Sequence, residues 1–184
     1  MGDLVKTASR LVRLSLRRQA YFLFRRYNGR IMEKSVATLS EFEAEAARFA
    51  GQLMPHERAT LVTLSGELGA GKTAFAKAIA RALGIEEIVT SPTFVLEKIY
   101  LLPEEKDFNY GMPKPAFKRL VHIDAYRLEK GSDLNALGFD ELIKDAENLI
   151  LLEWPEIVAD ALPAPAVAIA LVSHPDGSRT ISYG

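Results

Sequence analysis

The sequence predicts one α/β domain with three layers, in which a central mixed sheet lies between helices and the chain ends in an antiparallel hairpin. Three observations lead to this fold class. A glycine-rich loop joins an apolar strand at 61–64 to an alanine-rich helix at 73–83. Two later apolar runs, 120–124 and 149–153, have the length of buried strands, and each ends in a carboxylate. Two short alternating segments flank the Pro-Asp-Gly turn at 175–177, as in a β-hairpin.

The composition is that of an ordinary globular chain. Its 184 residues are 48% hydrophobic and 26% charged, which is enough for one core and too little for two comfortable domains. The absence of cysteine excludes disulfides and thiolate metal sites and favours the reducing cytoplasm. The three histidines, His56, His122 and His174, are scattered rather than set at metal-ligand spacing. No apolar run approaches the roughly 20 residues of a membrane span, so we expect a cytoplasmic protein.

Charge divides the chain into a basic extension, residues 1–31, and an acidic domain, residues 32–184. The extension holds eight of the 23 basic residues and only one acidic residue, which leaves 15 basic and 23 acidic residues in the domain. Leucine and phenylalanine lie among the arginines of the extension, as in a basic amphipathic helix that binds membranes or RNA, or in a transit peptide. A loosely ordered extension, or translation that truly starts at Met32, explains the same composition. We assign no function to this segment.

The residues around the glycine-rich loop predict two helices. Ser40-Glu41-Phe42-Glu43 has the form of a capping box, and the apolar spacing that follows predicts a helix ending near 51–55. Gly84 stops the helix at 73–83 in the manner of a helix C-cap.

The second half of the chain predicts further strands, which alternate with loops and short helices. The expected order is a strand at 94–102, a proline-containing loop at 103–118, a strand at 120–124, one or two short helices around Gly138 in 132–146, a strand at 149–153, and the hairpin strands 166–172 and 178–183.

The glycine-rich loop has the chemistry of a P-loop, which binds nucleotide phosphates. Its residues are Gly66-Glu67-Leu68-Gly69-Ala70-Gly71-Lys72-Thr73, the pattern Gly-x4-Gly-Lys-Thr. The glycines let backbone N–H groups curl around an anion, and the helix that follows directs its N-terminal partial charge at the same place. We expect Lys72 to reach the β- and γ-phosphates and Thr73 to bind Mg²⁺. Position 74 holds Ala74, so no second threonine is expected to bind the nucleotide there. The chain is therefore predicted to have a P-loop NTPase-like fold.

Magnesium at a P-loop usually needs a further carboxylate at the end of a neighbouring strand. Asp124 and Glu153 both qualify, and composition does not choose between them. Thr93, in Ser91-Pro92-Thr93-Phe94, follows the P-loop helix, where a threonine can sense the γ-phosphate or simply belong to a turn. A single tryptophan such as Trp154 is commonly a core or interface residue, and His122 within an apolar run is commonly structural.

These segments together resemble the TsaE family, formerly called YjeE. The resemblance covers about residues 34–172 and rests on four segments in the same order and spacing. They are the P-loop, Ser91-Pro92-Thr93-Phe94, His122-Ile123-Asp124-Ala125-Tyr126-Arg127-Leu128-Glu129 and Leu152-Glu153-Trp154-Pro155-Glu156. The P-loop alone would be unspecific, whereas the four segments together indicate one family.

The resemblance implies a role for each matching residue. Lys72 would bind phosphate, and Thr73 and Glu153 would hold Mg²⁺, with Glu153 acting as the Walker B acid. Thr93 falls in a switch-like motif, and Asp124 matches an aspartate associated with hydrolysis. Trp154 matches a tryptophan near the nucleotide or the partner surface. The loop residues Glu67, Leu68, Gly69, Ala70 and Gly71 would line the nucleotide.

The resemblance also implies a biological role for the chain. TsaE is the ATPase component of threonylcarbamoyladenosine synthesis, weak alone, and it is thought to reset the TsaB–TsaD complex, which modifies adenosine 37 of tRNA. Its contact with tRNA would be indirect. ATP is favoured over GTP through the family, and no Asn-Lys-x-Asp guanine signature occurs in the sequence. The basic extension and the long 103–118 loop depart from the family pattern.

Two other functions use the same motifs. A small-molecule or nucleoside kinase would need an arginine-rich lid over the phosphates. Arg119 and Arg127 stand apart, and the other arginines cluster before the P-loop or lie far from it. A nucleotide-gated binding module would bind ATP without turnover, even with its partners present.

Overall fold

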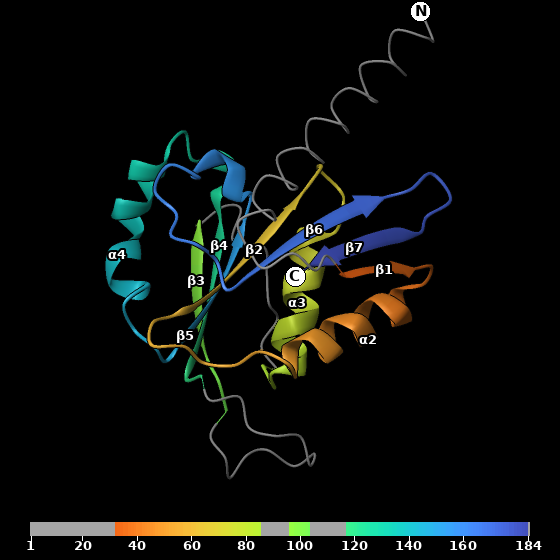
Figure 1. Cartoon of the computed structure of the whole chain (residues 1–184), viewed down its shortest axis with the longest axis horizontal. Helices are drawn as coiled ribbons and strands as arrows, with labels where there is room; N and C mark the ends of the chain where they lie inside the picture. The colour runs from red at the N-terminus through yellow and green to blue at the C-terminus, as the bar shows by residue number, and fades with distance from the viewer. Residues whose placement is uncertain (1–31, 86–95, 104–116, 184) are drawn as a thin grey trace, which may run out of the picture.

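The sheet of the protein is mixed, as the sequence predicts. A computed structural model describes residues 32–85, 96–103 and 117–183 (Figure 1). Within these residues, seven strands form one sheet in the order β1-β7-β6-β2-β5-β4-β3. Their bounds are β1 (Met32–Val36), β2 (Thr60–Gly66), β3 (Glu97–Leu101), β4 (Arg119–Asp124), β5 (Asn148–Glu153), β6 (Val167–Ser173) and β7 (Arg179–Tyr183). The four central strands, β6, β2, β5 and β4, are parallel, and the strands at both edges pair antiparallel.

Helices cover both faces of the sheet, which confirms the predicted three layers (Figure 1). One face carries α2 (Leu39–Ala50) and α3 (Lys72–Ala82), which pack on each other. The opposite face carries shorter elements: the 3₁₀ helices η3 (Ala125–Arg127), η4 (Gly131–Leu137) and η5 (Pro155–Ile157), and α4 (Phe139–Leu142). No helix in the described part of the chain is long and apolar enough to cross a membrane.

The central strands are apolar throughout because both of their faces are covered. Leu149 and Leu151 of β5 pack in the core under α2 and α3, whereas Ile150 and Leu152 pack under the short helices of the other face. All six residues of β5 are buried. This burial explains why the strand reads as a continuous apolar run, as parallel strands commonly do.

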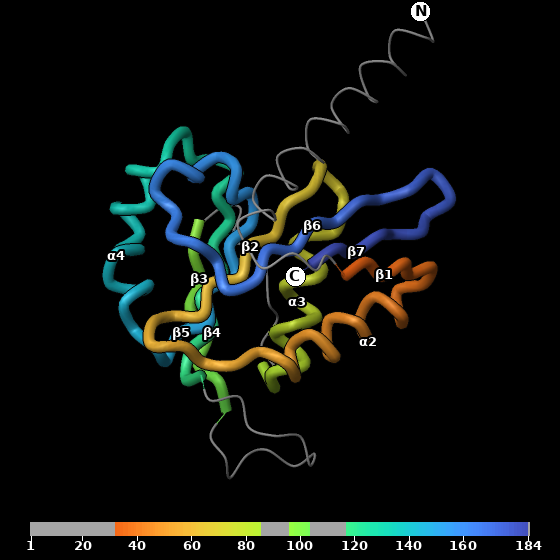
Figure 2. The backbone as a smooth tube through the Cα atoms, in the orientation of Figure 1, coloured from red at the N-terminus to blue at the C-terminus, as the bar shows by residue number. Residues whose placement is uncertain are grey.

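The C-terminal hairpin forms as predicted and supports the P-loop (Figure 2). Strand β6 pairs parallel to β2, which places Leu171 beside Gly66 at the start of the loop. A Cβ atom on Gly66 would lie 2.4 Å from the Leu171 carbonyl oxygen, and Gly66 has a φ of 143°. Glycine is therefore required here both for its conformation and for this close approach.

Strand β1 was not predicted from the sequence. It pairs antiparallel with β7 at the edge of the sheet, and Val36 is its single buried residue. Four exposed residues carry no hydrophobic alternation, so pairing with β7 rather than local pattern makes this segment a strand. Strand β3 begins at Glu97, and the first residues of its predicted range lie outside the described residues, as do the extension 1–31 and most of the 103–118 loop.

The N-cap of helix α2 lies two residues before the expected capping box. Thr38, not Ser40, is the N-cap. Its side chain accepts a hydrogen bond from the backbone N–H of Glu41, and the Glu41 carboxylate accepts one from the Thr38 backbone N–H. Both Thr38 and Ser40 are followed by a glutamate three residues later, at Glu41 and Glu43, so the sequence alone offers two registers.

Replacing the cap residue should destabilise the protein, whereas replacing Ser40 should not. We expect Thr38→Ala to lower the free energy of unfolding by about 1 kcal/mol, because it leaves a helix N–H group without its acceptor. Ser40→Ala, inside the helix, should change it by less than about 0.5 kcal/mol. Urea unfolding of both variants tests the assignment, and equal losses would contradict it.

Candidate functional site

The P-loop closes around the start of α3 and is open to solvent at its tip. Gly71 is the helix N-cap with a φ of 106°, and its carbonyl accepts the Phe75 N–H at 2.8 Å. Ala70 is fully buried, whereas Glu67, Leu68 and Gly69 are exposed. The loop is thus anchored at one end in the core and presents its tip and the helix N-terminus to a ligand, as anion binding requires.

Lys72 is held over the loop by three contacts. Its Nζ donates to the backbone carbonyls of Gly66 at 2.8 Å and Glu67 at 3.0 Å. It also lies 3.5 Å from the centre of the Trp154 ring, a cation–π contact. Burial lowers the pKa of Lys72, and the charges of Glu153, Glu156 and Asp124 oppose that shift. The charges of three acids therefore act on the P-loop lysine.

The first turn of α3 offers the site one hydroxyl group, that of Thr73. Position 74 holds Ala74, which is exposed and whose methyl side chain can neither bind a metal nor form a hydrogen bond. Thr73 alone provides the side-chain oxygen at the start of the helix.

Glu153 joins the P-loop helix to β4 through both of its carboxylate oxygens. Oε2 accepts the Thr73 hydroxyl at 2.9 Å, and Oε1 bonds His122 Nε2 at 2.8 Å. Both His122 and Glu153 are almost fully buried. The interpretation of His122 as merely structural is incomplete, because its ring fixes the direction of the carboxylate. An ionised carboxylate can only accept, so Nε2 carries the hydrogen when Glu153 is charged.

Asp124 ends β4 directly beside Glu153, at the same level of the parallel pair. Its Oδ1 accepts the Tyr126 N–H at 3.1 Å, and its own N–H donates to the Leu96 carbonyl. Both carboxylates that the sequence offered as candidates therefore belong to one site. They differ in that Glu153 contacts Thr73, while Asp124 caps the turn that follows β4.

Trp154 redirects the chain at the end of β5. Its φ of 60° is left-handed, which is rare for a large side chain, and its N–H donates to the Leu64 carbonyl of β2 at 3.1 Å. The ring lies against Lys72 on one side and is 5.1 Å from the Tyr126 ring. The predicted cofactor-binding tryptophan is thus part of the site, in contact with the P-loop lysine.

The residues present fit a magnesium ion bound together with a nucleotide. The Thr73 hydroxyl and a Glu153 oxygen lie 2.9 Å apart at the N-terminus of α3, and both are oxygen ligands of the kind Mg²⁺ prefers. No group of three or more His, Asp or Glu in the described residues could hold a metal by itself. Water and phosphate oxygens would therefore complete the coordination. Thr93, predicted as a switch residue, lies outside the described residues.

A family model named "Threonylcarbamoyl adenosine biosynthesis protein TsaE" matches residues 37–181. The chain belongs to the TsaE family. The TsaE protein of Treponema pallidum (strain Nichols) is 37% identical over 126 residues, which cover 68% of this chain and 82% of that protein. The TsaE protein of Bacillus subtilis (strain 168) is 36% identical over 123 residues, 67% of this chain and 68% of that protein. Both relatives carry the name tRNA threonylcarbamoyladenosine biosynthesis protein.

A solved structure agrees with this family and fold. The crystal structure of Bacillus subtilis YdiB matches with a TM-score of 0.62 and 28% sequence identity, over 84% of both chains. This TsaE family member therefore has the P-loop NTPase-like α/β fold that the sequence predicts.

Arg179 lies beside the P-loop of this TsaE family member, a position that sequence reasoning missed. Its Nε lies 3.4 Å from where a Cβ of Gly71 would be, and its guanidinium lies over the Phe42 ring at 5.5 Å. Nε is buried and has no hydrogen-bond partner in the described residues. The expectation that the arginines outside the extension lie far from the P-loop is wrong here, because the hairpin returns β7 to the loop. The position of Arg179 could not be predicted because the sequence does not show the register in which β6 pairs with β2.

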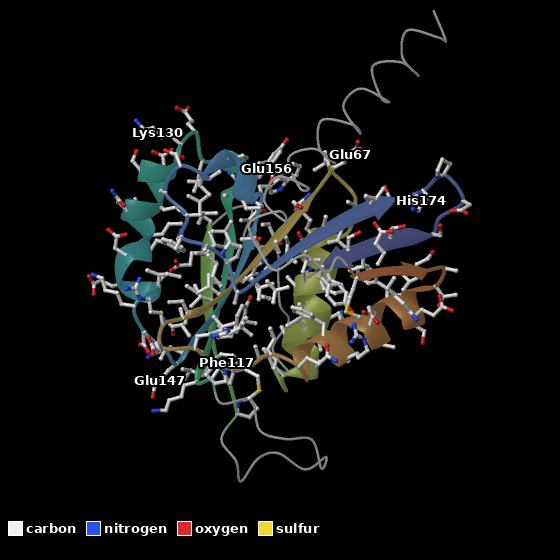
Figure 3. The ribbon with its side chains drawn as sticks, in the orientation of Figure 1. Glu67, Phe117, Lys130, Glu147, Glu156 and His174 are labelled. Atoms are coloured by element: carbon white, nitrogen blue, oxygen red, sulfur yellow. The ribbon has the colours of Figure 1, made fainter. Side chains whose placement is uncertain are left out.

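Glu156 is the second missed residue, although it stands in the Leu-Glu-Trp-Pro-Glu segment. Figure 3 shows it at the same end of the sheet as Glu67, and Glu147 at the opposite end. Both of its carboxylate oxygens are buried without a hydrogen-bond partner in another described residue. Burial raises the pKa of Glu156, and a hydrogen bond from its own backbone N–H and the charge of Lys72 oppose this shift. A buried acid without partners is uncommon in native proteins and indicates a functional position.

The raised pKa of Glu156 makes a prediction about stability. The folded protein holds this proton more strongly than the unfolded chain, so the free energy of unfolding falls as the pH rises from the ordinary value of 4.5 through the folded pKa. The glutamine side chain of Glu156→Gln is uncharged at every pH, so the variant should not lose stability in this way as the pH rises. We expect the variant to melt at a higher temperature than the parent at about pH 8, and the difference between the two melting temperatures to vanish at about pH 4.

Thermal unfolding of both proteins at the two pH values tests this expectation. Glu141→Gln on α4 is the matched control, because the Glu141 side chain is 82% exposed. The melting temperature of this control should differ from that of the parent by the same amount at both pH values. A Glu156→Gln variant that loses stability at high pH relative to the parent would contradict the burial argument.

Proposed function

We propose that this chain is a magnesium-dependent ATPase that supports or resets the TsaB–TsaD complex in threonylcarbamoyladenosine modification of tRNA. One observation carries the proposal: Lys72, Thr73 and Glu153 meet at the N-terminus of α3, directly below the P-loop. This arrangement joins a phosphate-binding cation to a hydroxyl–carboxylate pair suited to Mg²⁺. The names of the family and its relatives support the tRNA pathway.

Each residue of the site has a role in this proposal. The loop N–H groups and the start of α3 would bind the β-phosphate, and Lys72 would bridge to the γ-phosphate. Thr73 and Glu153 would hold Mg²⁺, which when bound neutralises charge on the phosphates. His122 keeps the Glu153 carboxylate turned toward Thr73. Asp124, which stands beside Glu153, would act on the hydrolysis side of the site.

The rim of the site supports a role in contacting partner proteins. Leu68 at the loop tip is 77% exposed, and Tyr126, which touches Trp154, is 48% exposed. Exposed apolar side chains beside a nucleotide site are suited to a protein that reads whether ATP or ADP is bound. TsaB and TsaD are the partners that the family implies, and tRNA would be reached through them.

Removing the P-loop lysine tests the ATPase proposal. We expect Lys72→Ala to reduce phosphate release from Mg-ATP by at least about 100-fold, because the variant loses a charge that acts on the transferring phosphate. The measurement is made on the chain alone and with TsaB and TsaD from the same organism. The parent should be slow alone and clearly faster with the partners.

Lys144→Ala is the matched control, because this lysine lies on α4 with a side chain 64% exposed. It should hydrolyse ATP like the parent. No rise with TsaB and TsaD would refute the proposed partners. Phosphate transfer that needs an added small acceptor would indicate a kinase, and binding without turnover under every condition would indicate a nucleotide-gated module.

Arg179 makes a separate prediction about nucleotide affinity. Its guanidinium lies against Gly71, where it would add positive charge beside the phosphates. We expect Arg179→Gln to raise the Kd for ATP by about 10-fold, the value of one charge-assisted hydrogen bond. Arg81→Gln, at an arginine 61% exposed and paired with Glu43, should leave the Kd unchanged. Equal affinities of the two variants would show that Arg179 only packs on Phe42.

A further inference from the structure

We propose that Glu156 accepts the proton of the water that attacks the γ-phosphate. This inference rests on the proposed ATPase function and names a catalytic residue within it. Neither the P-loop pattern nor the order of the sequence motifs assigns a role to Glu156. Three observations carry the assignment: its place in the site, its unused oxygens, and the occupation of the other two acids.

The place of Glu156 follows from the turn at Trp154. The left-handed backbone of Trp154 ends β5 and sends the chain into η5, which packs against β2. Glu156 lies in the middle of η5, at the end of the sheet where the P-loop stands (Figure 3). Its charge acts on Lys72, the residue that would bridge to the γ-phosphate. The carboxylate therefore lies at the P-loop end of the sheet, where its charge acts on Lys72.

The oxygens of Glu156 are unused, which distinguishes it from the other acids around Lys72. Both Glu153 oxygens are occupied, one by Thr73 and one by His122. Asp124 accepts from the Tyr126 backbone. Neither oxygen of Glu156 has a hydrogen-bond partner in another described residue, although both are buried. A proton acceptor needs free lone pairs in a site shielded from bulk water, and Glu156 meets both conditions.

The step balances without another reactant. A lone pair of the water oxygen forms the new bond to the γ-phosphorus, and the bond from that phosphorus to the β–γ bridging oxygen breaks. The bridging oxygen keeps the electron pair as part of ADP. One water proton passes to a Glu156 oxygen and is later released to solvent. Burial favours the protonated form of a carboxyl group, so it helps the carboxylate take this proton.

The experiment compares Glu156→Gln and Glu156→Asp with the parent chain in the presence of Mg-ATP, TsaB and TsaD. Phosphate release and the Kd of a fluorescent ATP analogue are measured on the same preparations. We expect Gln to lower phosphate release by about 100-fold or more while the Kd changes by less than about threefold, because Gln keeps the shape and loses the basic oxygen. Glu156→Asp shortens the side chain by one methylene, so its rate of phosphate release should lie between those of Glu156→Gln and the parent.

Glu147→Gln is the matched control, since it makes the same chemical change at the opposite end of the sheet (Figure 3). It should behave like the parent in both measurements. Thermal unfolding accompanies each variant, and the Gln variant should melt no lower than the parent, so a loss of turnover is not a loss of fold. Should the Gln variant unfold, full phosphate release by the Asp variant would still refute the assignment.

The outcomes separate this inference from the function on which it rests. Phosphate release by Glu156→Gln within threefold of an active parent would overturn the assignment and leave the ATPase function standing. A large rise in Kd with unchanged turnover at saturating ATP would make Glu156 a binding residue and also overturn it. An inactive parent would refute the ATPase proposal itself, and the role of Glu156 with it.

Discussion

The site depends on the register in which three parallel strands end. Leu64 of β2 pairs with Glu153 of β5, and Glu153 pairs with Asp124 of β4, so β5 and β4 finish at one level, two residues before β2 ends at Gly66. A slip of one residue in β5 would turn Glu153 to the other face of the sheet, away from Thr73. The apolar residues on both faces of β5 oppose such a slip, because they pack in two different cores. The packing of the sheet interior therefore determines the geometry of its polar end.

The electrostatics of the site oppose a bare polyphosphate and favour one that carries a cation. Asp124, Glu153 and Glu156 all act on Lys72, so negative charge exceeds positive charge around the P-loop lysine. A nucleotide bound with magnesium would reduce this repulsion, because the metal would be held by the hydroxyl and carboxylate oxygens of Thr73 and Glu153. Arg179 adds positive charge from β7 on the side of Gly71.

Sequence reasoning succeeded where chemistry is local and failed where long-range pairing decides. The P-loop, the two carboxylate strand ends and the hairpin are short patterns, and each forms where it was expected. Arg179 and β1 could not be placed, because their positions depend on which strand lies next to β7. Thr38 was missed because two capping patterns overlap, and the tertiary position of α2 selects one. Glu156 was missed for another reason: the sequence does not show that its carboxylate oxygens are buried, or that no other described residue bonds them.

The close approach of Gly66 to the Leu171 carbonyl has a consequence for how the protein folds. The P-loop is contiguous in sequence, yet the strand that supports it comes from the far end of the described chain. Contacts between segments so distant require a large loop to close first, which slows folding. The loop therefore cannot reach its final shape as an early local hairpin or helix would. Competence to bind a nucleotide should arise late, together with the completed sheet, and partly folded chains should not compete for ATP.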